Sequence, residues 1–121
     1  MVVMRVLVCG GRDYNRELAF DCEMDALDMP RGSVVIEGGA RGADALARGY
    51  ARIYRFVTES YPADWRKHGK AAGPIRNQRM IDEGKPDLVV AFPGGKGTAD
   101  MVRRAKAAGI KTIMADSKLQ D

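Results

Sequence analysis

The sequence contains few of the residues that carry metal and redox chemistry. It has two cysteines, Cys9 and Cys22, and a single histidine, His68. The cysteines form no CxxC pair, which argues against both a disulfide framework and a structural zinc site. We therefore expect no bound metal and no resident cofactor.

Long apolar stretches are also absent. No run approaches the roughly 20 residues that a membrane span needs, and the first residues show no signal-peptide pattern. The 121 residues are 45% hydrophobic and 30% charged, which is typical of a soluble globular protein with one domain. We therefore expect a cytoplasmic protein without membrane contact, with one domain at residues 1–115 and a short tail at 116–121.

Glycine, in contrast, is abundant, with 14 residues of 121 against a usual share of about 7%. Charge is uneven as well, because residues 41–79 carry nine basic and three acidic residues. Clustered glycine indicates places where the backbone approaches something closely, and a basic segment suits either an anionic partner or a solvated face. Eight of the glycines lie in three clusters: Gly10 and Gly11; Gly38, Gly39 and Gly42; and Gly94, Gly95 and Gly97.

Apolar, β-branched runs alternate with helical patterns along the chain. Strands are expected at residues 2–9, 33–37, 55–61, 87–92 and 110–115. Helices are expected at residues 16–28, 43–54, 74–84 and 99–108, with an ordered loop at 62–73. Asp13 or Asn15 can cap the first helix, and Thr98 the last. The alternation predicts an α/β fold, a single Rossmann-like three-layer α/β/α sandwich whose parallel sheet has about five strands.

The three glycine clusters all follow predicted strands, so they are expected to meet at the carboxyl edge of the sheet. Each carries a cation and leads toward a helix N-terminus, where free N–H groups attract anions. The simpler interpretation is that glycine allows tight turns and that the arginines reach solvent. We expect instead a ligand site formed by Gly10, Gly11, Arg12, Gly38, Gly39, Arg41, Gly42, Asp44, Arg76, Asn77, Arg79, Gly94, Gly95, Lys96, Gly97 and Thr98.

These clusters do not match the motifs of the common nucleotide cofactors. The residues after the first strand, 10–15, read GGRDYN and lack the third glycine of GxGxxG. A Walker lysine–serine pair is missing too, so binding of NAD, FAD or Walker-type ATP is disfavoured.

Five motifs in order resemble those of the small stand-alone YspA, cpYpsA-related SLOG family. They are GGRD at 10–13, GGARGAD at 38–44, PADW at 62–65, GPIRNQRM at 73–80 and FPGGKGT at 92–98. The last of them is similar to the PGGxGT motif of the LOG phosphoribohydrolases, and parts of the second and fourth resemble the ARGxD and RNR stretches of the DNA-processing protein DprA/Smf. The resemblance implies a Rossmann-like fold, a nucleotide or nucleotide-derived ligand, and self-association into a homo-oligomer.

One position departs from the phosphoribohydrolase pattern. The glutamate that follows PGGxGT in those enzymes is replaced by Met101, which cannot transfer a proton. Asp100 is adjacent, but one residue along a helix turns a side chain by about 100°. The weak candidates for catalytic acids are therefore Glu37, Asp44, Asp64 and Asp100.

Three functions remain open from the sequence. The first is binding of a phosphorylated nucleotide or nucleotide-derived ligand, in a sensing, sequestering or processing role. The second is an enzyme, a nucleotide N-glycosidase-type hydrolase that uses one of the four acids. The third is single-stranded DNA binding of the DprA type, which the scarcity of aromatic residues, 7% of the chain, makes less favoured. Trp65 either stacks on a base or packs as part of a core or lid.

Overall fold

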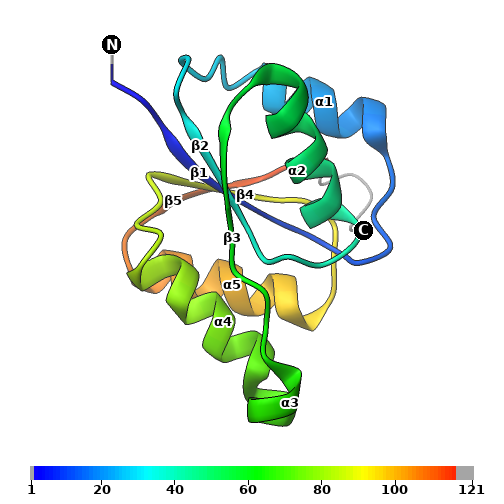
Figure 1. The fold of residues 1–121 in the computed structure, drawn as a ribbon, viewed down its shortest axis with the longest axis vertical. Helices are drawn as coiled ribbons and strands as arrows, with labels where there is room; N and C mark the ends of the chain where they lie inside the picture. The colour runs from blue at the N-terminus through cyan, green and yellow to red at the C-terminus, as the bar shows by residue number, and fades with distance from the viewer. Residues whose placement is uncertain (1, 117–121) are drawn as a thin grey trace.

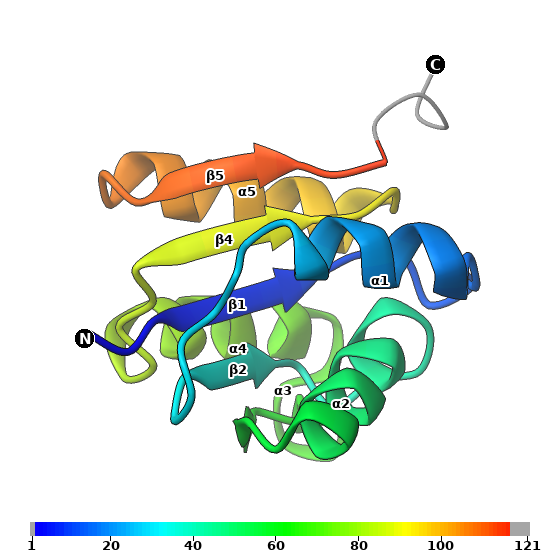
Figure 2. The same ribbon diagram turned by 90° about the horizontal axis from the view of Figure 1, so that it is seen from above.

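The computed structural model describes residues 2–116, whose five strands form one parallel sheet between two layers of helices (Figures 1 and 2). The strand order is β3-β2-β1-β4-β5, and every neighbouring pair is parallel. The α/β class and the Rossmann-like sandwich predicted from the sequence are confirmed. The strands are β1 (Arg5–Cys9), β2 (Val34–Glu37), β3 (Val57–Ser60), β4 (Leu88–Ala91) and β5 (Lys111–Met114).

Four longer helices cover the two faces of the sheet. Helices α1 (Glu17–Asp25) and α2 (Ala43–Tyr54) lie on one face, and α4 (Ala72–Asp82) and α5 (Lys96–Ala107) lie on the other (Figure 2). Among residues 2–116, no helix has the length and the apolar character needed to cross a bilayer.

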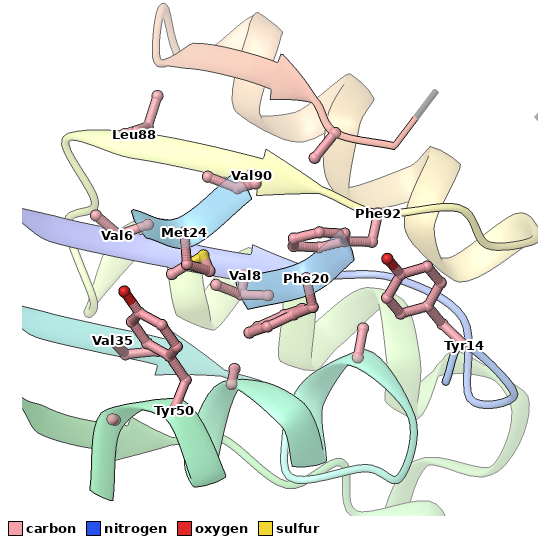
Figure 3. Packing of buried hydrophobic residues seen from close by; sticks show 14 residues of the cluster. Val6, Val8, Tyr14, Phe20, Met24, Val35, Tyr50, Leu88, Val90 and Phe92 are labelled. Atoms are coloured by element: carbon pink, nitrogen blue, oxygen red, sulfur yellow. The ribbon is translucent and has the colours of Figure 1, made fainter. Parts of the chain in front are cut away.

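Each face has its own hydrophobic core, because the central strands are apolar on both sides. On the α1/α2 face, Phe20 of α1 stacks on Phe92 with ring centroids 4.6 Å apart (Figure 3). On the other face, Leu7 and Ile36 pack with Met80 of α4 and Met101 of α5. Burial on both faces is the reason that these strands contain almost no polar residues.

The order of the strands reverses beside β1. The chain runs outward from β1 through β2 to β3, and then returns to place β4 and β5 on the opposite side. The loops after β1 and β4 therefore diverge at a topological switch point, which is where ligands bind in open α/β sheets. Two of the three glycine clusters lie in these two loops.

The segment predicted as an ordered loop at 62–73 is largely helical. It contains α3 (Trp65–His68) and a 3₁₀ turn, η1 (Gly69–Ala71), and it ends in the first residues of α4. Asp64 caps α3 by accepting a hydrogen bond from the Lys67 N–H at 3.1 Å. One turn of helix is too short to show periodicity, which is why the pattern did not indicate it.

The predicted helix caps are also wrong. Helix α1 begins at Glu17 after Arg16, with no side-chain cap, and neither Asp13 nor Asn15 serves as one. Helix α5 begins at Lys96 with Gly95 in the N-cap position, so Thr98 lies inside its first turn. Helix α4 begins two residues before Pro74, which leaves Arg76 beyond the first turn.

The first residue of the predicted tail contacts the loop before α1. Asp116, assigned to the tail, accepts hydrogen bonds from the Tyr14 hydroxyl at 2.9 Å and from Arg16 at 3.0 Å. This contact joins the end of β5 to the loop before α1. The rest of the predicted tail, 117–121, lies outside the described residues.

Candidate ligand-binding site

The three glycine-rich loops contact one another at the carboxyl edge of the sheet. The Gly11 N–H donates to the Pro93 carbonyl at 2.8 Å, and the Ala43 N–H donates to the Gly11 carbonyl at 3.1 Å. A Cβ on Gly10 would lie 2.6 Å from that of Ala43, and a Cβ on Gly42, where φ is +73°, would collide with the Gly11 carbonyl. These glycines are required for the loops to pack together.

A cavity of about 560 Å³ opens at this edge. That volume lies in the range of pockets that hold a small molecule. Its walls come from the loops after β1, β2 and β4, from α3 and η1, and from residues of α2, α4 and α5. It is lined by Cys9, Gly10, Gly11, Arg12, Ala40, Asp44, Trp65, Lys70, Gly73, Pro74, Arg76, Asn77, Met80, Gly95, Lys96, Gly97, Thr98, Asp100 and Arg103.

Most of the residues that the sequence indicated lie around this cavity, and six do not. Gly38, Gly39, Gly42 and Gly94 belong to the packed loops behind its wall. Arg41 points to solvent and pairs with Asp13 at 3.2 Å. Arg79 pairs with Glu83 at 2.9 Å and lies over the Tyr61 ring. Those lining the cavity are Gly10, Gly11, Arg12, Asp44, Arg76, Asn77, Gly95, Lys96, Gly97 and Thr98.

Five cationic side chains line the cavity: Arg12, Lys70, Arg76, Lys96 and Arg103. Within residues 2–116, Lys70 and Lys96 form no salt bridge and the Arg12 guanidinium makes no hydrogen bond, whereas Arg103 pairs with a cavity carboxylate, Asp100. The five cations face two carboxylates in this cavity, Asp44 and Asp100, and such an excess of positive charge favours an anionic ligand.

Arg76 and its neighbour Asn77 form the floor on the α4 side. The Arg76 Nη1 donates to the Gly38 carbonyl at 2.6 Å, and its Nε donates to Asn77 Oδ1 at 2.9 Å. Burial lowers the pKa of Arg76 from its ordinary value, and the nearby charge of Arg12 lowers it further, while Asp44 acts to raise it. The buried Asn77 amide in turn donates to the Gly97 carbonyl and to Asp100, so that it ties α4 to the start of α5.

Asp44 is the one buried carboxylate among the described cavity residues, with 8% of its surface exposed. Burial raises its pKa above the ordinary value, although the hydrogen bond from the Ala40 N–H opposes that shift. Gly38 lies between this carboxylate and Arg76, since a Cβ there would be 3.0 Å from Asp44 Oδ2 and 2.9 Å from Arg76 Cζ. A carboxyl group with a raised pKa in a cavity is able to hold and transfer a proton.

Asp100 is placed differently from Asp44. It accepts hydrogen bonds from Arg104 at 2.8 Å and from Asn77 at 3.0 Å. Burial acts to raise its pKa, but these two hydrogen bonds outweigh burial and lower the pKa below the ordinary value. Asp100 is therefore a fixed anion that holds α4 and α5 together.

The other two candidate acids do not line the cavity. Glu37 is fully buried, and its carboxylate accepts from Arg48 at 2.6 Å, from the Gly39 N–H at 2.6 Å and from the Ser60 hydroxyl. Asp64 serves as the cap of α3. Met101 is 1% exposed in the core between α5 and the sheet, so no acid occupies the position of the phosphoribohydrolase glutamate.

Cys9 is a buried residue that lines the cavity. Burial and the nearby charge of Asp44 raise the pKa of its thiol to about 12, which keeps it protonated and unreactive at neutral pH. No group of three or more metal-ligating side chains occurs among the described residues.

Several lining residues were not indicated by the sequence. Lys70, Gly73 and Pro74 lie in and after the short helical segment that showed no periodicity. Arg103 had a detectable signal, because Lys96, Asp100 and Arg103 are spaced by four and three residues and therefore share one face of α5.

Gly95 and Gly97 differ from the other glycines of the edge. A Cβ at either position would meet no atom within 4 Å, and both residues line the cavity. Glycine inside a helix costs about 1 kcal/mol relative to alanine, and packing does not require it at Gly97. Because Gly95 and Gly97 have no side chains, the backbone N–H groups of the first turn of α5 are open to the cavity.

The fold and site together define a Rossmann-like α/β domain with a cationic cavity at the switch point of its sheet. Residues 4–68, which include GGRD, GGARGAD and PADW, match the YspA, cpYpsA-related SLOG family. The chain is also 41% identical over 118 residues to the "Gene 61 protein" of Mycobacterium phage D29, with 90% of this chain and 94% of the phage protein covered. The chain therefore belongs to the YspA, cpYpsA-related SLOG family. No solved structure matches it.

Proposed function

We propose that this protein binds a phosphorylated nucleotide or nucleotide-derived ligand in the cavity at the carboxyl edge of its sheet. Membership of the SLOG family supports a nucleotide-related ligand at a coarse level. The observation that carries the finer proposal is the set of five cationic side chains around one 560 Å³ cavity, next to the open backbone of Gly95 and Gly97.

The start of α5 is the natural position for a phosphate. The first N–H groups of a helix have no acceptor within the helix, and the helix dipole favours an anion there. Lys96 is the first residue of α5, where a cation opposes the dipole unless an anion is bound between them. Arg12 and Arg76 repel each other across the cavity, and a bound phosphate would relieve that repulsion as well.

A thermal-shift panel tests this proposal. It contains the four nucleoside monophosphates, ADP-ribose, a cyclic dinucleotide, NAD and a short DNA strand, with sodium chloride at equal ionic strength as the control. A ligand at a hundred times its Kd should add about 2.7 kcal/mol to the free energy of unfolding, which raises the Tm of a domain of this size by several degrees.

The panel also separates this proposal from single-stranded DNA binding. If the nucleotides leave the Tm unchanged and the DNA strand raises it, with an affinity that falls with salt at a slope of about 0.7 per phosphate, the proposal is wrong. Three of the nine basic residues of the segment 41–79, Arg41, Arg48 and Arg79, pair with carboxylates of the protein itself, which reduces the attraction of this segment for DNA.

One observation favours a second candidate function, hydrolysis of an N-glycosidic bond. Asp44 lines the cavity, and burial raises the pKa of its carboxyl group, as a general acid requires. A general acid must carry its proton, so the rate of base release should fall as the pH rises above the pKa of Asp44.

The assay for this activity is chromatography of AMP incubated with the protein, which detects free adenine. Asp44→Asn should abolish adenine release and leave AMP binding in place, because the amide oxygen can still accept from the Ala40 N–H. Equal release by Asp44→Asn and the unaltered protein would contradict the hydrolase hypothesis.

A further inference from the structure

Trp65 is unusual among the aromatic side chains because it is exposed and lines the cavity. It begins α3, and 47% of its surface is accessible. One edge of the indole faces Gly73 of α4, since a Cβ on Gly73 would lie 3.4 Å from Trp65 Cη2. A large, half-exposed aromatic ring that lines a cavity offers a surface to a planar ligand.

The Arg12 guanidinium now lies over that face. Its Cζ is 5.2 Å from the ring centroid, a cation–π contact. Such contacts at exposed sites are weak, and the Arg12 side chain makes no hydrogen bond within the described part of the chain. The contact is therefore easily exchanged for a stronger one.

A nucleobase and Arg12 cannot share this face. Stacked rings are themselves roughly 4.5–7 Å apart between centroids, so the 5.2 Å gap has no room for a second ring. Stacking of a base on an aromatic side chain is stronger than an exposed cation–π contact of the kind it would replace. The displaced guanidinium would gain a phosphate as partner, a charge-assisted and often bidentate interaction.

We propose that Trp65 is the base-stacking platform of the cavity, and that Arg12 covers the indole until a base displaces it and the guanidinium turns to the ligand phosphate. This inference rests on the proposed function and names the ligand class more narrowly. The ligand carries both an aromatic base and a phosphate, and a sugar phosphate alone is a poor substitute.

Calorimetric titration of the full chain with AMP and with ribose 5-phosphate tests this, because the two probes differ only in the base. AMP should bind about 10-fold to 100-fold more tightly than ribose 5-phosphate. Trp65→Leu should reduce the affinity for AMP to that for ribose 5-phosphate and leave the latter unchanged. Trp65→Phe should keep most of the preference, since the aromatic face is retained.

Tyr54→Leu is the matched control. Tyr54 is 50% exposed, similar to Trp65, but it lies on α2 and does not line the cavity, so both affinities should be unchanged. Trp65 is the single tryptophan of the sequence, and its fluorescence should therefore be quenched by AMP and much less by ribose 5-phosphate.

Two results would overturn the inference, and they can be told apart. If AMP and ribose 5-phosphate bind equally, or if Trp65→Leu weakens both alike, phosphate binding stands and the platform is refuted. If neither AMP nor ribose 5-phosphate binds, the proposed function fails together with the platform.

Discussion

Replacement of Gly95 by aspartate is expected to abolish binding of a phosphorylated ligand and leave the fold intact. Gly95 is the N-cap of α5 with φ at −101°, and no atom lies within 4 Å of the position of its Cβ. Aspartate is among the preferred N-cap residues, so the Tm should be equal to or above that of the unaltered protein. Its carboxylate would lie beside the first N–H groups of α5 and repel phosphate. This repulsion should weaken binding by about 100-fold or more.

Two further variants separate charge from shape in this experiment. Gly95→Ser caps the helix without a charge, and its affinity should fall by less than about 10-fold. Gly49→Asp introduces the same charge on α2, at a residue that does not line the cavity and whose Cβ would also meet no neighbour within 4 Å, so binding should be unchanged. Normal binding by Gly95→Asp in calorimetry would show that the phosphate does not lie at α5.

The fold was predictable because its signals are local and repeated. The central strands are apolar runs that need burial on both faces, and the helix at 43–54 shows one apolar stripe. The errors in the predicted helix boundaries concern helix ends that are marked by one side-chain hydrogen bond or by none. Asp64 caps one turn of helix, and Gly95 begins α5 without any side-chain cap, so neither boundary could be deduced from residue preference.

The candidate site was predictable only in part, for a related reason. Glycine clusters after strands indicated which loops meet, but not which glycines pack and which remain open. Gly42 and Gly97 have the same letter in the sequence, yet a Cβ at Gly42 would collide with backbone and one at Gly97 would meet nothing. The role of Glu37 depends on Arg48 and Ser60, which are distant in the sequence. The role of Arg79 depends on the direction in which its face of α4 points. A single sequence specifies neither.

Replacement of Glu37 by leucine should have the largest effect on stability. Glu37 is fully buried at the end of β2, and its carboxylate accepts from Arg48, from the Gly39 N–H and from Ser60. Leucine removes the acceptor for all three donors, and breaking a buried ion pair typically costs about 3–5 kcal/mol. Arg48 is 38% exposed and can regain water, so we expect a loss near the lower end, about 3 kcal/mol, or roughly 10 °C in Tm.

Glu37→Gln distinguishes a structural role of this residue from a catalytic one. The amide oxygen can still accept from the Gly39 N–H and from Arg48, which both bond to Oε1, and the amide NH2 can donate to the Ser60 hydroxyl in place of the bond that Oε2 accepts. The main loss is the charge opposite Arg48, so the decrease in Tm should be less than half of that for Glu37→Leu. Because Glu37 does not line the cavity, AMP should bind Glu37→Gln with unchanged affinity below its Tm. A stable Glu37→Gln protein that fails to bind AMP would place this carboxylate in the site after all. Unchanged binding with a lowered Tm assigns Glu37 to the β2–β3 edge, where it holds the glycine loop behind the cavity wall in position.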